Sequence, residues 1–169
     1  ETEKSLAIDV VVDGLVEPDQ GFVVTLGNAS GGAQIIVNNA TGTILNDDST
    51  DLSISLADPD KPEGDSGCTT YSFTVTREGD TSGETTVDYT LGPIEAYPAD
   101  ANDFCADLYG GGIPSGTLYF GPGESVYTLS IAMQGDTEIE QNEDFEIKLS
   151  NPSGAARIVG AEAIADIRN

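Results

Sequence analysis

The chain has 169 residues, which is enough for one domain, or for one domain and a fragment of another. Its 30 acidic and 6 basic side chains give a formal net charge of −24, which disfavours binding to nucleic acid or to an anionic membrane. The absence of His excludes Ser-His-Asp triads, Cys-His pairs and His-ligated zinc, and two Cys cannot close a Cys₄ site. No apolar stretch approaches the 18 residues of a membrane-spanning helix, so no membrane insertion is predicted.

Alternation of apolar and polar residues predicts short β-strands along the whole chain. In chain order, the alternating runs cover residues 6–12, 22–26, 52–56, 71–75, 87–89, 118–120, 129–133 and 145–149. Turn sequences rich in Gly, Pro, Ser and Asp separate the runs, and no window keeps helical spacing for a dozen residues. This pattern predicts an all-β sandwich.

An internal repeat organises the chain. Residues 5–46 align without a gap on residues 128–169, with 14 identities in 42 positions, and Phe22 falls on Phe145. We therefore expect residues 1–48 to be the C-terminal half of a module and residues 49–169 to be a complete one. A half-sandwich leaves strand edges bare. Either the chain is part of a longer one, or a neighbouring chain supplies the missing strands by β-augmentation.

Two sequence stretches carry a family resemblance. Residues 16–33, which begin Val-Glu-Pro-Asp, and residues 40–48, which end Asn-Asp-Asp, resemble Calx-β domains. These are calcium-binding immunoglobulin-like modules of sodium–calcium exchangers, integrin β4 and bacterial surface proteins. Residues 63–65, 102–104 and 116–124 repeat the pattern in the second module. The resemblance implies a seven-stranded immunoglobulin-like β-sandwich for residues 49–169, preceded by half of another in residues 1–48.

The resemblance also implies a Ca²⁺ site, because the calcium-binding members gather carboxylates at one tip of the sandwich. Carried over by position, the candidate ligands are Glu63, Glu95, Asp100, Asp103 and Asp107, with Asp47 and Asp48 at the end of the first module. Asp136 and Glu140 fall on an acidic turn that some members use. Ca²⁺ takes six to eight oxygen ligands, and clustered carboxylates repel one another without a cation. The alternative is that these acidic loops are simply solvated.

The ligand set departs from the family pattern at one point. The second module reaches only Asn169, where the family's terminal acidic pair would follow. Neither module is therefore expected to hold a full ligand set by itself, and a neighbouring chain or a longer polypeptide would complete it.

The two cysteines are the next feature with a structural consequence. In the inferred fold Cys68 and Cys105 lie in loops at the same tip, which predicts a disulfide; two free buried thiols are the alternative. Closing a loop of about 38 residues would stabilise the fold by roughly 4 kcal/mol in the chain-entropy model. A disulfide would place the protein in an oxidising compartment, outside the cell or at its surface.

No catalytic motif stands out. Glu140 and Glu143 could in principle act as an acid–base pair, but such a pair on a sandwich edge is more often surface charge, so no enzyme is predicted. The favoured function is an extracellular structural or adhesive protein stiffened by Ca²⁺ at module junctions. One alternative is a self-assembling filament subunit whose half module pairs with an identical neighbour, and another is a calcium-sensing regulatory module. The expected partners are proteins, either neighbouring modules or identical subunits.

Overall fold

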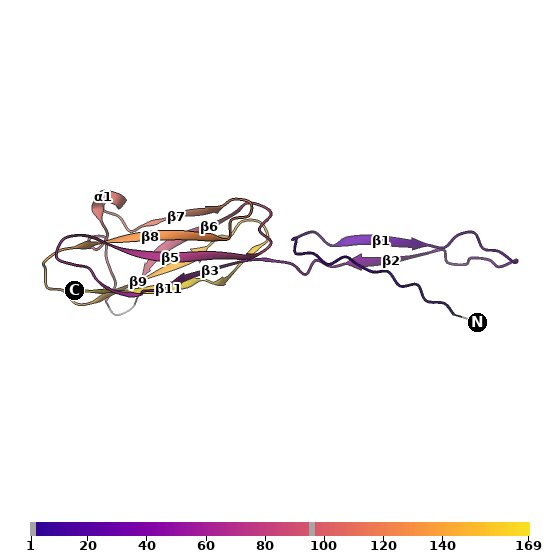
Figure 1. Ribbon diagram of the computed structural model, residues 1–169, viewed down its shortest axis with the longest axis horizontal. Helices are drawn as coiled ribbons and strands as arrows, with labels where there is room; N and C mark the ends of the chain where they lie inside the picture. Colours follow the sequence, from indigo (N-terminus) through magenta and orange to yellow (C-terminus); the bar gives the residue numbers. More distant parts are fainter. Residues whose placement is uncertain (1–2, 95–96) are drawn as a thin grey trace. The chain divides into compact units, whose positions relative to one another are not determined.

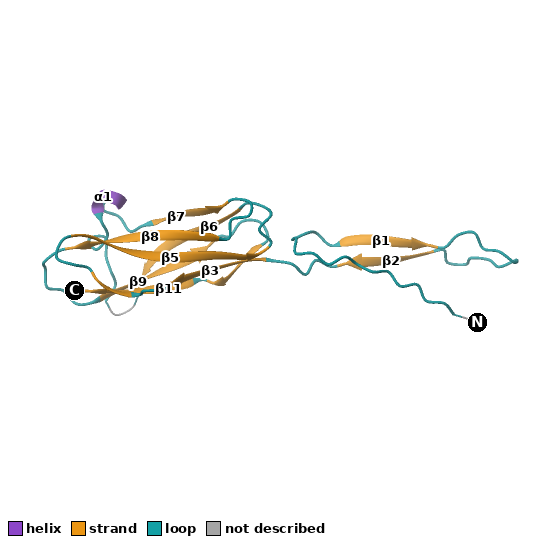
Figure 2. Ribbon diagram, in the orientation of Figure 1, coloured by secondary structure: helices purple, strands orange, loops and turns teal. Residues whose placement is uncertain are grey.

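The computed structural model describes residues 3–94 and 97–169, and it divides into two compact units. Unit 1 is Glu1–Asp48 and unit 2 is Ser49–Asn169. Figures 1 and 2 show strands in both units and the short helix α1 (Ala106–Tyr109) in unit 2. Within the described residues, no helix is long and apolar enough to cross a membrane.

In unit 1, residues 3–48 form one antiparallel pair of strands, β1 (Gln20–Thr25) and β2 (Asn39–Ile44). Phe22 lies opposite Gly42, and its ring occupies the space that a Cβ on that glycine would fill. The strand predicted over residues 6–12 is absent from the structure. The alternation there is real, but a strand also needs a hydrogen-bonding neighbour, and unit 1 provides none for this segment.

Unit 2 is a β-sandwich of two sheets, which confirms the predicted fold class. One sheet has the strand order β10-β3-β5-β8 and the other β4-β11-β9-β6-β7. The bounds are β3 (Thr50–Leu56), β4 (Asp60–Pro62), β5 (Gly67–Gly79), β6 (Thr85–Pro93), β7 (Ser115–Phe120), β8 (Val126–Gly135), β9 (Glu143–Ser150), β10 (Ala156–Gly160) and β11 (Glu162–Arg168).

The described residues of unit 2 form nine strands, whereas the resemblance implies seven. The difference arises because the first and last strands each cross from one sheet to the other. β3 and β4 are separated by a short break that contains Pro59, whose ring cannot donate to a ladder. β10 and β11 are separated at Ala161, and they pair in parallel with β3 and β4 respectively. These crossings tie the two layers together at their edges.

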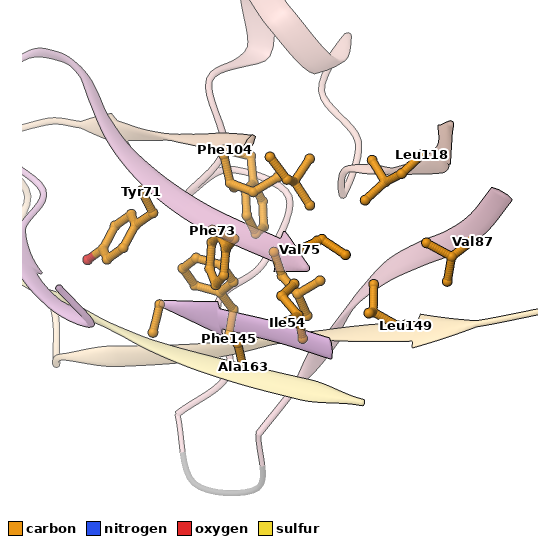
Figure 3. Packing of buried hydrophobic residues seen from close by; sticks show 14 of the residues in the cluster. Ile54, Tyr71, Phe73, Val75, Val87, Phe104, Leu118, Phe145, Leu149 and Ala163 are labelled. Atoms are coloured by element: carbon orange, nitrogen blue, oxygen red, sulfur yellow. The ribbon is translucent and has the colours of Figure 1, made fainter. Parts of the chain in front are cut away.

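The core lies between the two sheets, and aromatic rings dominate it near one end. Phe145 on β9 is 1 % exposed and packs edge-on against Tyr71, Phe73 and Phe104, with ring centroids 5.5, 6.0 and 5.9 Å away. Figure 3 shows these rings together with the aliphatic side chains that continue the core. The phenol oxygen of Tyr71 donates to the carbonyl of Asp166, so the buried hydroxyl is satisfied.

Arg77 closes the core at the other end. This side chain is 1 % exposed and donates to the carbonyls of Thr81, Gly83 and Gly121 and to the hydroxyl of Thr85, over 2.9–3.0 Å. The three carbonyls belong to the β5–β6 and β7–β8 turns, and Thr85 is the first residue of β6. Its guanidinium also lies 5.6 Å from the centroid of the Phe120 ring. Arg77 thus holds two turns against the sandwich with neutral acceptors.

Candidate metal centre

Acidic side chains gather at the end of unit 2 where β4 ends, β5 begins and β8 leads into β9. We call this group the acidic tip. Glu63 follows β4, and Glu143 is the first residue of β9. The other members lie in the β6–α1 connection and in the β8–β9 connection. Its members are Glu63, Asp100, Asp103, Asp136, Glu138, Glu140 and Glu143. The C-terminus and α1 lie at this same end of unit 2 (Figure 1).

Three of these carboxylates form the tightest group. One carboxylate oxygen each from Glu63, Asp136 and Glu140 lies within 4.8 Å of the others. A cavity of about 290 Å³, lined in part by Glu63, Asp136 and Glu138, opens beside them. The side-chain amide of Asn169 donates to Glu63 Oε1 (2.8 Å) and to the carbonyl of Glu138 (2.9 Å). The group therefore brings together three separate parts of the sequence, namely residue 63, residues 136–140 and residue 169.

Strand register and one glycine explain how Glu63 reaches Asp136. Gly67 at the start of β5 pairs with Gly135 at the end of β8, so the segments beyond both strands meet. A Cβ on Gly135 would lie 2.8 Å from the carbonyl oxygen of Glu63 and 2.5 Å from that of Gly64. Only a residue without a side chain permits this approach. The Glu63 backbone is fixed further by its N–H bond to Arg168 (3.0 Å) and by the Thr69 hydroxyl (2.7 Å).

Backbone hydrogen bonds hold the Asp100–Asp103 segment against both sheets. The carbonyl of Asp103 accepts from the N–H of Gln134 (2.7 Å), and Cys105 donates to Ala132 (3.1 Å). On the other side, the N–H of Ala99 donates to Asp144 (3.0 Å). Within the segment, the Asp103 carboxylate accepts from the backbone N–H of Asp100. The two aspartates are therefore placed by β8 and β9 and not by the loop alone.

The electrostatics of the acidic tip favour a cation. Burial raises the pKa of Glu63, the neighbouring carboxylate of Asp136 raises it further, and the hydrogen bond from Asn169 opposes both. Desolvation, with Asp103 and Asp136 nearby, raises the pKa of Glu140. Burial, together with Asp103, raises the pKa of Glu143 to about 8. A positive charge placed among these carboxylates would offset their mutual repulsion.

The disulfide Cys68–Cys105 joins the start of β5 to the segment that carries Asp103, which confirms the predicted pairing. Cys105 is fully buried, and its Cα lies 6.3 Å from that of Cys68. The bond therefore connects, covalently, the two regions that present Glu63 and Asp103.

The acidic tip contains only some of the predicted ligands. Glu63, Asp100 and Asp103 lie in it, together with Asp136 and Glu140 from the acidic turn. Asp107 lies exposed on α1, and no contact among the described residues joins it to the group. Glu95 lies outside the described residues.

Asp47 and Asp48 belong to unit 1, where the Asn46 side chain donates to the carbonyl of Asp48 (2.9 Å).

Two members of the acidic tip, Glu138 and Glu143, were not predicted as site residues, and neither was Asn169, which bonds to the tip. Glu143 was interpreted as surface charge. Asn169 was mentioned only as the position after which the family's terminal acidic pair would come. The position of Glu143 could have identified it as a site residue, because it lies three residues after Glu140 and just before an alternating run. Its significance depends on Asp103, whose charge and side-chain hydrogen bond raise the pKa of Glu143. That contact depends on how the β6–α1 connection packs, which no local pattern reveals.

Comparison with known proteins places this geometry in a family. The Calx-beta domain family matches residues 1–49 and 50–168. Adhesion G-protein coupled receptor V1 of Danio rerio is 30% identical over 158 residues, which cover 89% of this chain but only 2% of the receptor. The chain thus spans a small fraction of that relative's length.

Solved structures show the same fold. The apo-form Calx CBD1 domain superposes with a TM-score of 0.57 at 22% identity, covering 72% of this chain and 97% of that one. CBD12 from CALX1.2 gives a TM-score of 0.55 at 25% identity, covering 69% of this chain and 43% of that one. The calcium binding domain CBD12 of CALX1.1 gives a TM-score of 0.56 at 24% identity, covering 70% of this chain and 45% of that one. With the family match extending over both units, the chain belongs to the Calx-β family.

Proposed function

We propose that unit 2 binds Ca²⁺ at the acidic tip. The observation that carries the proposal is the convergence of the Glu63, Asp136 and Glu140 carboxylates within 4.8 Å, with pKa values of Glu63 and Glu140 raised by burial and mutual repulsion. Carboxylate and carbonyl oxygens are the ligands Ca²⁺ takes, and three carboxylates can supply up to about six of them. The Glu138 carbonyl lies beside this group and offers a further oxygen, and the Asn169 amide nitrogen donates to both Glu63 and that carbonyl.

The role we propose for this site is structural, in an extracellular or cell-surface protein of modular, adhesive type. The disulfide favours an oxidising compartment, and the relative in Danio rerio is an adhesion receptor. β11 ends at the acidic tip, so a bound Ca²⁺ would order the loops that surround the end of β11. Calx-β domains are binding modules, and the proposal assigns no catalytic step to this one. A cytosolic calcium sensor would use the same site, but the disulfide weighs against that compartment.

The proposal is tested by titrating the full chain with CaCl₂ after chelator treatment and dialysis. We expect saturable binding, with a dissociation constant on the order of 10⁻⁴–10⁻³ M as in other extracellular modules. Hydrogen exchange should slow in residues 97–107 and 136–142 and recover on addition of EGTA. MgCl₂ at the same concentration should protect these segments less, because Mg²⁺ sheds its waters reluctantly. An unchanged exchange pattern at millimolar Ca²⁺ would contradict the proposal.

Binding is expected to depend on pH in one direction. The metal takes deprotonated carboxylates, and Glu143, with its pKa near 8, holds its proton at pH 7 in the metal-free protein. Affinity should therefore rise with pH, by at most about tenfold per pH unit for the one proton, and level off above pH 8. Calorimetry at pH 7 in two buffers of different ionisation enthalpy measures the proton released on binding. The Glu143→Gln variant is the control, because its binding should release less proton.

The same shifts set how the metal-free fold responds to pH. The pKa values of Glu63, Glu140 and Glu143 are raised above the 4.5 of an unfolded glutamate, so the native state binds more protons than the unfolded chain. Stability of unit 2 should then fall as the pH rises from about 4.5 to about 8, and Ca²⁺ should remove most of this slope. A melting temperature that rises with pH in chelator would contradict the raised pKa values.

A further inference from the structure

The described residues of unit 2 form two sheets that end in four edge strands, β4, β7, β8 and β10. Two of these edges are protected against pairing with a further strand. β4 is three residues long and contains Lys61 and Pro62. β10 carries Arg157, and its register with β3 shifts between Ile158 and Gly160, which marks a bulge. Short length, charge, proline and bulges are the features by which edge strands avoid further pairing.

The third edge, β8, is covered over part of its length by residues 103–105. An isolated bridge joins Phe104 to Met133, and the N–H of Cys105 donates to the carbonyl of Ala132 (3.1 Å). This segment occupies the end of β8 that leads to the acidic tip, so a second strand cannot pair along the whole of β8.

β7 has none of these protections. Among the described residues it pairs only with β6, from Thr85↔Phe120 to Thr90↔Ser115. Its sequence, Ser-Gly-Thr-Leu-Tyr-Phe, contains no charged residue and no proline, and no register shift interrupts its pairing. β7 is drawn near the upper margin of unit 2 in Figure 1. Its outer edge therefore presents backbone N–H and C=O groups that another strand can bond.

The uncharged surface continues from β7 onto β8. β8 also lacks charged residues, and the ring centroid of Tyr127 lies 6.1 Å from that of Phe120. Tyr119 is 49 % exposed and Val126 is 57 % exposed on these two strands. In a chain with a net charge of −24, this side is where a second copy meets the least repulsion. A basic partner would instead be attracted to strands with acidic side chains, such as β9 and β11.

We propose that β7 pairs with β7 of a second copy of this chain, antiparallel and across a twofold axis. Side chains directly opposite each other in an antiparallel pair lie on the same face of the sheet. Leu118 and Phe120 are buried in the core, whereas Thr117 and Tyr119 are exposed, so the axis passes beside Thr117 or beside Leu118. The pairing joins two five-stranded sheets into one continuous sheet and uses the same surface of both copies. It does not depend on the Ca²⁺ site.

Sedimentation velocity of the full chain in EGTA tests for this dimer. A joint built on one strand pair is small, so we expect weak association, with a dissociation constant on the order of 10⁻⁴ M. Association should strengthen between about 0.1 M and about 1 M NaCl, because salt screens the repulsion between the two acidic copies. A chain that stays monomeric at about 1 mM protein in 1 M NaCl would overturn the proposal. So would association that weakens with salt.

Chemical cross-linking of Thr117→Cys locates the joint. The two introduced thiols would lie about 5 Å apart in one register and about 8 Å apart in the other, within reach of a short bismaleimide. Thr90→Cys is the matched control, because Thr90 is exposed on β6, one strand inside the edge. Its thiols would be separated by three strand spacings, about 14 Å, and should give at least about tenfold less cross-linked dimer. Equal cross-linking of the two variants would contradict a β7 joint.

A charge on the joint should dissolve it. Thr117→Asp places like charges on the two sides of the axis and should weaken association by at least about tenfold. Thr90→Asp makes the same change in net charge and should leave the dissociation constant within about twofold of the parent value. Near-ultraviolet circular dichroism of tyrosine checks that both variants are folded. A dimer that Thr117→Asp leaves intact would mean that the copies meet through another edge, and the proposal would fail.

Discussion

Replacing Asp136 and Glu140 together, as Asp136→Asn and Glu140→Gln, is expected to weaken Ca²⁺ binding to unit 2 by at least about 100-fold. The two carboxylates supply two of the three convergent anionic ligands, and loss of even an outer contact to a metal costs about 10–100-fold. Calorimetric titration of the full chain measures the change. The double variant should also be more stable than the parent in chelator, because the remaining Glu63 loses a repelling neighbour.

Weaker Ca²⁺ binding together with higher stability in chelator would exclude misfolding as the cause of the lost affinity. A variant that binds weakly because it is unfolded would melt earlier, whereas the expected variant melts later without metal. Asp107→Asn is the matched control, because it removes one exposed acidic charge from a position on α1 outside the acidic tip. Its affinity should match that of the parent chain. Equal affinity of the parent and the double variant would place the Ca²⁺ site elsewhere.

Phe145→Ala is expected to destabilise unit 2 by about 3–5 kcal/mol, the range for removal of a buried aromatic ring. Phe145 is 1 % exposed and contacts three other rings, so its loss leaves a cavity that neighbouring strands cannot easily close. All six tyrosines lie in unit 2, so near-ultraviolet circular dichroism of tyrosine reports the unfolding of this unit alone. Urea titration then gives the free energy of unfolding.

The repeat supplies the control for this change. Phe22→Ala removes the equivalent ring from unit 1, where Phe22 is only half-buried over Gly42. Because Phe22 belongs to unit 1 and all six tyrosines belong to unit 2, this change should leave the tyrosine-detected transition of unit 2 unaltered. A loss of less than about 1 kcal/mol on Phe145→Ala would show that the aromatic cluster repacks around the gap.

Much of the fold could be predicted because the alternation of apolar and polar residues in a β-strand is visible within the strand's own sequence. The runs at 71–75, 129–133 and 145–149 became β5, β8 and β9, with the expected side chains inward. Residues 6–12 show the limit of that pattern, since alternation identifies a face but not the neighbour that a strand requires. The crossing of the first and last strands between sheets was also not predicted, because it depends on both layers being assembled.

The candidate site was predictable in part for a related reason. Glu63, Asp100 and Asp103 were identified from loop motifs that the family shares. The high pKa of Glu143 arises mainly from burial and from the approach of Asp103, which lies 40 positions earlier in the sequence. Contacts of this kind follow from the register of β5 on β8 and from the close approach at Gly135, and neither is visible in local spacing.

The disulfide limits how far unit 2 can be extended by force. Cys68 and Cys105 are 37 residues apart, and the loop between them cannot extend while the bond is intact. An unfolded unit 2 pulled from its ends would therefore lengthen by about 120–130 Å less than the reduced form, at roughly 3.3–3.6 Å per residue. The bond also keeps β5 linked to the segment bearing Asp103 during extension. When the force falls, the chain would begin refolding with the two sides of its acidic tip still joined.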